Sequence, residues 1–169
     1  MKLSIAELSP VFNTSRMVAE YAHKAYAPAA ASWRILRANN LAAARDQAHW
    51  LRRIGAAWND VNVVQLEDTA TDSVLAGTII EVTARINTAG LAPSDLRVDI
   101  LYGPADPSGE LAADNETPLT LVHQTEDGNY IFKGSFAPEQ GGNVGYAVRI
   151  LPLHPNLHSP FVTGLAHWA

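Results

Sequence analysis

The chain has 169 residues, of which 47% are hydrophobic, enough to fold as one domain or as a small domain with a helical appendage. It has no cysteine, which excludes disulfides, thiolate metal sites and cysteine nucleophiles and is compatible with a reducing cytoplasm. Neither a signal-peptide pattern nor an apolar run approaching about 18 residues is present, so we expect a cytoplasmic protein without a membrane partner.

The formal charge of −5 conceals a difference between the two parts of the chain. Residues 1–58 contain eight Lys or Arg and three Asp or Glu, a net +5, whereas residues 59–169 contain four and fourteen, a net −10. The basic residues of the first part are spread around its predicted helices and form no recognisable nucleic-acid-binding motif. Because the acidic part would also repel a phosphate backbone, we expect no nucleic-acid partner.

The first eleven residues are weakly patterned and are predicted to be an extended lead-in. Asn13-Thr14-Ser15 then offers helix caps, and the helix is predicted to run until Pro28 interrupts it. Its apolar residues recur at three- and four-residue steps: Met17, Val18, Tyr21 and Ala25. A short helix with such a stripe needs a partner, so we predict that these four residues make a domain or subunit contact, either by folding back on the sandwich or by being buried against a second copy of the chain.

A second helical stretch carries Trp33 and Leu36, and it pauses at Asn39-Asn40, a pair that favours caps and turns. A third helix follows, with one apolar stripe. The stripe consists of Leu41, Ala44, Ala48, Leu51, Ile54 and Trp58. We therefore expect two or three helices within a helical segment at 1–59.

From Val61 onward the hydrophobic period changes to two, as in strands that bury one face. The stretch 144–150 is the clearest case and is predicted to be a central strand, and Asp127-Gly128 is the clearest hairpin turn. Seven strands are predicted, at 61–67, 74–87, 95–102, 118–126, 129–136, 143–151 and 161–168. The fold class is therefore α+β: N-terminal helices followed by a seven-stranded immunoglobulin-like antiparallel β-sandwich at 60–169.

Residues with catalytic or metal-binding chemistry do not gather in the sequence. His154 and His158 have a spacing that suits a metal on a helix, but the surrounding prolines favour turn and packing roles. The acidic residues fall mostly in turns and strand ends, where solubilising charges are common, although a pair assembled in space for glycoside chemistry stays open. We predict no catalytic, metal-binding or cofactor-binding residue.

Aromatic residues leave one binding hypothesis open. Tyr102, Tyr130 and Trp168 could stack on a sugar ring from a sandwich face or loop. The alternative interpretation, which is the commoner one, places the same rings in the core or at a sheet edge.

Two stretches resemble a known family. One is Asn13-Thr14-Ser15-Arg16-Met17-Val18-Ala19-Glu20-Tyr21, and the other is the tail from Val148-Arg149-Ile150-Leu151-Pro152 to Gly164-Leu165-Ala166-His167-Trp168-Ala169. They resemble the last catalytic-domain helix and the carboxyl end of bacterial α-glucan phosphorylases of the glycogen and maltodextrin type. The resemblance implies a parent enzyme that holds pyridoxal phosphate on a lysine and releases glucose 1-phosphate from α-1,4-glucan with inorganic phosphate.

The matching stretches lie outside the catalytic machinery of that family, so no cofactor lysine and no catalytic residue carries over to this sequence. The leading hypothesis is a non-catalytic carboxyl-terminal accessory region that contacts the catalytic domains of a parent enzyme or forms a homodimer through its first helices. The alternative is a carbohydrate-binding sandwich that tethers the enzyme to α-glucan. An autonomous enzyme is the third hypothesis.

Overall fold

The computed structural model describes residues 12–71, 74–139 and 141–169. Its contacts divide the chain into two compact units, which meet in sequence between His49 and Trp50. Within the described ranges, no helix is long and apolar enough to cross a membrane.

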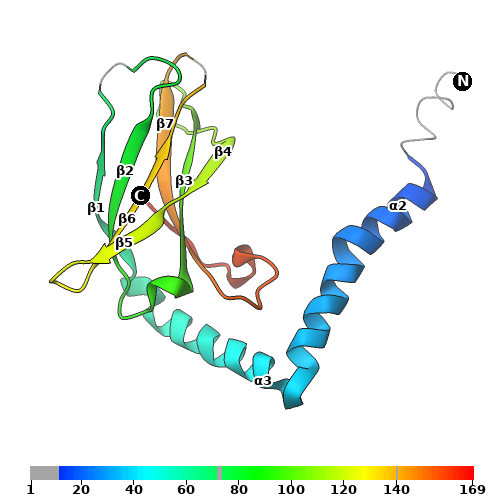
Figure 1. Cartoon of the computed structure of the whole chain (residues 1–169). Coiled ribbons are helices and arrows are strands. Elements are labelled where there is room, and N and C mark those ends of the chain that lie inside the picture. The colour runs from blue at the N-terminus through cyan, green and yellow to red at the C-terminus, as the bar shows by residue number, and fades with distance from the viewer. Residues whose placement is uncertain (1–11, 72–73, 140) are drawn as a thin grey trace, which may run out of the picture. The chain divides into compact units, whose positions relative to one another are not determined.

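The first unit is helical (Figure 1). Helix α2 (Thr14–Tyr21) begins at Asn13, whose Oδ1 accepts the N–H of Arg16 at 2.8 Å. A π-helix, η1 (Ala22–Tyr26), leads directly into α3 (Ala27–Ala57). The predicted interruption at Pro28 is wrong, because the helical backbone passes through this residue. A proline ring crowds the carbonyl four residues earlier, and the wider π-turn lies just where that crowding would occur.

The backbone of α3 is broken in its middle. Ala38 is extended at φ −61° and ψ 157°, and Asn39, Asn40 and Leu41 have positive φ of 50°, 55° and 63°. Asparagine adopts this left-handed conformation more readily than most residues. The predicted pause at Asn39-Asn40 is thus confirmed, although the helical stretches on its N-terminal side are joined rather than separate.

The last turns of α3 belong to the second unit and pack into its core. Trp50 and Ile54 are buried, as is Trp58 in the following 3₁₀-helix η2 (Trp58–Asp60), so every fourth residue faces inward. The prediction included Ile54 and Trp58 correctly. It was wrong about Leu51, which is 41% exposed, because the helix turns Trp50 inward in its place.

The described residues of the second unit form eight strands in two four-stranded antiparallel sheets (Figure 1). The first sheet has the order β1-β2-β6-β5 and the second β4-β3-β7-β8. Their bounds are β1 Asn62–Asp68, β2 Ile80–Asn87, β3 Leu96–Pro104, β4 Asn115–Pro118, β5 Thr120–Gln124, β6 Tyr130–Phe136, β7 Val144–Pro152 and β8 His167–Trp168. Short 3₁₀-helices, η3 (Pro93–Asp95) and η4 (Pro160–Thr163), lie in the connections.

The count of seven strands was wrong because one predicted strand is two. Pro118, the first residue of the predicted strand at 118–126, is the last residue of β4, which pairs with β3, whereas Thr120–Gln124 form β5, which pairs with β6. Buried Leu119 lies at the change of sheet, and its N–H donates to the carbonyl oxygen of Val98 at 2.8 Å. The last predicted strand is also shorter, since Pro160 begins η4 and Gly164 ends it at φ 68°.

Most of the remaining strand predictions agree with the structure, but the strand predicted at 74–87 is too long, since β2 begins only at Ile80. β7 is an interior strand that pairs with both β3 and β8, and Val148 and Ile150 are fully buried between the sheets. The Asp127-Gly128 turn joins β5 to β6, with Gly128 at φ 86°. The α+β class is confirmed, whereas the immunoglobulin-like assignment and the boundary at 59/60 stay predictions.

Candidate functional site

The first unit presents an exposed apolar surface on α2 and η1. Met17, Val18 and Tyr21 are each more than half exposed, Ala25 is exposed, and none of the α2 residues is buried. The π-turn also places Tyr26 beside Tyr21, with ring centroids 6.3 Å apart. Sequence reasoning missed Tyr26 because a five-residue step falls on one face of a π-helix but not of an α-helix.

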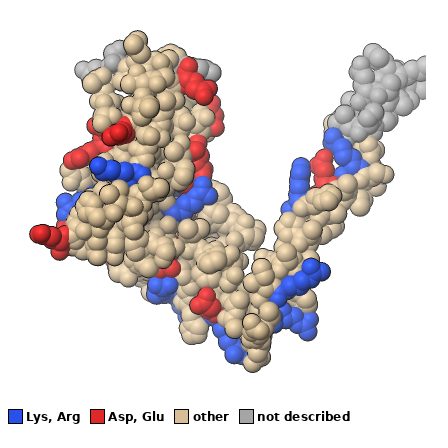
Figure 2. Space-filling model, viewed as in Figure 1, with Lys and Arg blue, Asp and Glu red and all other residues tan. Residues whose placement is uncertain are grey.

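Charged side chains flank this surface. Glu20 Oε1 lies 3.4 Å from Arg16 Nε, and Glu20 Oε2 lies 3.5 Å from Lys24 Nζ. These exposed pairs at four-residue spacing stabilise the helix weakly. Figure 2 shows basic side chains along the helical segment and acidic side chains scattered over the sandwich, as the division of charge in the sequence predicts.

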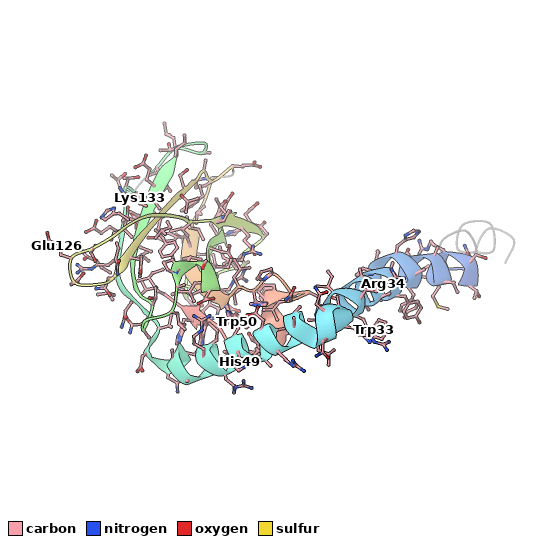
Figure 3. The ribbon with its side chains drawn as sticks, turned by 60° about the horizontal axis from the view of Figure 1, so that its bottom comes forward. Trp33, Arg34, His49, Trp50, Glu126 and Lys133 are labelled. Atoms are coloured by element: carbon pink, nitrogen blue, oxygen red, sulfur yellow. The ribbon has the colours of Figure 1, made fainter. Side chains whose placement is uncertain are left out.

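Trp50 at the end of α3, labelled in Figure 3, and Trp58 in η2 both pack against the sandwich within the second unit. The indole N–H of Trp50 donates to Asp95 Oδ1 at 2.9 Å, and both Nη atoms of Arg53 donate to the same carboxylate. The Trp50 ring also packs on His154, with centroids 4.8 Å apart. Asp95 is the last residue of η3, directly before β3, so these contacts tie the helix to the start of the second sheet's strand β3.

Trp58 repeats this arrangement with a second histidine. Its ring stacks on His167 of β8 at 5.2 Å, and His167 Nε2 lies 2.8 Å from the Trp58 carbonyl oxygen. His167 therefore has a packing role against Trp58, as His154 does against Trp50. Among residues 12–71, 74–139 and 141–169, no group of three metal-ligating side chains is found.

A buried ion network lies on the face of the second sheet that points away from the other sheet. Asp99 is fully buried and accepts hydrogen bonds from Arg97 Nε at 2.9 Å and Arg149 Nη2 at 3.2 Å. Arg149 Nη2 also donates to Glu116 Oε2 at 2.7 Å, and Arg97 pairs with Glu116 Oε1. Hydrogen bonds and charge from Asp99, followed by the Glu116 charge, raise the pKa of Arg97. The network joins β3, β4 and β7.

A hydrogen bond between side chains links the two sheets of the sandwich. Tyr146 on β7 donates its phenol to Asp68 Oδ2 on β1 at 2.5 Å, which links the two sheets. Burial, together with the hydrogen bond and charge of Asp68, raises the pKa of the Tyr146 phenol far above its ordinary value.

The three predicted sugar-stacking residues lie in different places. Tyr102 packs on Phe136 with centroids 4.6 Å apart, and it lines a cleft of about 210 Å³ with Asp114, Asn115 and Asn143. Tyr130 is half-buried against the core, and Trp168 is exposed on β8. The structure does not bring these three rings together.

Comparison with known proteins places the chain in a family. Residues 58–169 match the family model described as the glycogen phosphorylase C-terminal domain. The chain belongs to this family. Glycogen phosphorylase of Mycobacterium bovis is 36% identical over 164 residues, which are 96% of this chain and 19% of that protein. Glycogen phosphorylase of Mycobacterium tuberculosis H37Rv is 35% identical with the same coverage.

An archaeal relative extends the comparison. Maltodextrin phosphorylase of Thermococcus litoralis is 31% identical over 173 aligned positions, 99% of this chain and 20% of that protein. The chain thus spans about a fifth of the length of the curated relatives that it matches. The glycogen phosphorylase C-terminal domain model begins at Trp58, whereas the contact unit that contains it begins at Trp50.

The described lysines of this chain do not suit pyridoxal phosphate, the cofactor that the resemblance implies for a parent enzyme. Lys24 is exposed on η1 beside Glu20, and Lys133 is exposed on β6 (Figure 3). A Schiff-base lysine needs an enclosing site that binds the cofactor phosphate and lowers the lysine pKa. Neither position offers one, and Lys2 lies outside the described residues.

Proposed function

We propose that this chain is a non-catalytic accessory region of an α-glucan phosphorylase, whose whole protein would convert α-1,4-glucan and phosphate to glucose 1-phosphate. The observation that carries the proposal is the coverage: the match takes in 96% of this chain but only 19% of a glycogen phosphorylase. Pyridoxal phosphate and the reacting groups would then belong to the other four fifths. A cytoplasmic location is part of the same proposal.

The partner that best suits the exposed stripe of the first unit is the catalytic part of the same enzyme. Met17, Val18, Tyr21 and Tyr26 expose apolar side chains along one short helical stretch, and such a row rarely stays in water. A second copy of the chain is the other candidate for this surface. Substitutions in this stripe distinguish the two candidates through their effect on the melting temperature of the whole enzyme.

The strand order supports the proposal that the sandwich is immunoglobulin-like. In that fold one sheet has the order ABED, and the other has CFG with an added C′ strand in some members. Naming β1 to β8 as A, B, C, C′, D, E, F and G turns the observed orders into ABED and C′CFG. The sandwich would then be a scaffold rather than a catalytic fold.

Two assays test the proposed function. Incubation of this chain with maltoheptaose, inorganic phosphate and pyridoxal phosphate should release no glucose 1-phosphate, and genuine turnover would overturn the proposal. In a phosphorylase that ends with these 169 residues, the double substitution Met17→Ser and Tyr21→Ser should lower the melting temperature of the whole enzyme. Ala19→Ser, on the other side of α2, is the matched control and should leave it unchanged.

The concentration dependence of that melting temperature separates the two partners. Contact within one polypeptide makes the loss independent of protein concentration, whereas a homodimer makes the loss smaller on dilution, because the unsubstituted dimer then dissociates as well. An enzyme that tolerates the double substitution as well as it tolerates Ala19→Ser would count against a docking role for the stripe.

A further inference from the structure

Two exposed aromatic rings are held on one buried cation in the second unit. The guanidinium carbon of Arg149 lies 5.2 Å from the ring centroid of Phe161 and 5.5 Å from that of Trp168. Arg149 is 6% exposed, whereas Phe161 and Trp168 are 60% and 59% exposed. Each ring therefore contacts the guanidinium with part of its surface, and most of the remaining ring surface is exposed to solvent.

The rings are mounted on ordered backbone. Trp168 lies opposite Arg149 in the β7–β8 pair, and the next residue, Ala169, exchanges two backbone hydrogen bonds with Val148, at 2.7 and 2.9 Å. Phe161 lies in η4, where Ser159 Oγ accepts its N–H at 3.3 Å. Their positions are thus fixed before any ligand arrives, which reduces the entropy lost on binding.

The ion network holds the Arg149 guanidinium beside both rings. Asp99 and Glu116 both accept hydrogen bonds from Arg149 Nη2, so moving the guanidinium away would break its ion pair with the buried Asp99. Glu116 and Arg97 are themselves partly exposed, with side chains 38% and 37% accessible. Carboxylate oxygens and guanidinium N–H groups therefore lie in the same network as the aromatic rings.

We propose that Phe161 and Trp168, held on Arg149, form a surface platform that stacks on glucosyl units of an α-1,4-glucan. Exposed rings beside hydrogen-bonding groups suit a pyranose, which offers an apolar C–H face and a rim of hydroxyls. Residues 59–169 carry a net charge of −10, which repels polyanions but does not repel a neutral sugar. The choice of α-1,4-glucan among neutral sugars rests on the proposed function.

The test is a titration of this chain with maltoheptaose, observed through the four indole N–H signals by NMR. The Trp168 signal should shift and saturate at millimolar ligand, and those of buried Trp50 and Trp58 should not. Trp168→Ala and Phe161→Ala should each weaken binding about tenfold. Trp33→Ala is the matched control, because Trp33 is 57% exposed and also lies on a guanidinium, that of Arg37 at 4.8 Å.

Three outcomes would overturn the platform. They are an unmoved Trp168 signal in the unsubstituted chain, equal weakening by Trp33→Ala, and equal binding of a β-1,4-linked glucan. The first readout needs no variant, so a substitution that unfolds the chain does not remove the test. If the Trp168 signal does not shift, a contact with protein is the better explanation of the exposed Phe161 and Trp168 surface. Failure here is also separate from failure of the proposed function, which only phosphorolysis by the isolated chain or tolerance of the stripe substitutions would contradict.

Discussion

Individual charged and polar residues carry much of the specificity of the sandwich. Arg149 is the one residue among the Lys, Arg, Asp and Glu types in β7, and sequence reasoning did not find its partners. Those partners are Asp99 on β3 and Glu116 on β4, together with Phe161 and Trp168 of the tail. No local pattern predicts a group assembled from four separate segments, since only the pairing register brings them together.

Substitution of Asp99 should be costly because it leaves Arg149 buried with less compensating charge. We expect Asp99→Asn to lower the free energy of unfolding by about 3 kcal/mol. Arg85→Gln breaks an exposed pair with Asp127 and should cost less than about 1 kcal/mol, so it serves as the control. Urea unfolding followed by circular dichroism measures both. Equal losses would show that the buried network has no special role.

Tyr146 should give a measurable pH dependence. Its folded pKa is raised, so its contribution to stability is complete below about pH 10, the ordinary tyrosine pKa, and declines as the pH rises above that value. Tyr146→Phe removes the hydrogen bond to Asp68 and should cost about 1 kcal/mol at neutral pH. Above pH 10 this difference should shrink, because only the unsubstituted chain has this phenol to ionise on unfolding. A constant difference from pH 7 to 11 would contradict this assignment.

At the scale of elements, the sequence predicted what depends on local pattern and missed what depends on packing. The interior strand β7, the Asp127-Gly128 turn and the break at Asn39-Asn40 follow from alternation and turn chemistry. The division between β4 and β5 does not, because it is set by burial of Leu119 between the sheets. Trp50 was likewise missed, since its inward direction depends on the partners Asp95 and His154.

The end of α3 should be an integral part of the sandwich unit. A chain starting at residue 58, where the family match begins, lacks Trp50 and Ile54, which are buried in the core. We expect it to be less stable than a chain starting at residue 46 by at least about 3 kcal/mol, the usual cost of deleting one large core side chain. Thermal unfolding of both chains measures the difference. Equal stability would instead favour the boundary predicted at 59/60.

In the whole molecule, the sandwich unit buries its apolar side chains in a core of its own, whereas helix α2 of the helical unit leaves its apolar side chains exposed. The sandwich has a continuous core between two sheets. The α2 helix buries none of its own residues. The central claim is that residues 12–26 become covered by the catalytic part of an α-glucan phosphorylase.

Amide hydrogen exchange over residues 12–26 tests this claim most directly. It compares the isolated chain with a phosphorylase that ends with the same 169 residues. Exchange at α2 and η1 should be fast in the isolated chain and at least about tenfold slower in the larger enzyme, because burial opposes local opening. Strands β3 and β7, which are already protected, serve as the internal reference. Equally fast exchange at residues 12–26 in both proteins would contradict the account.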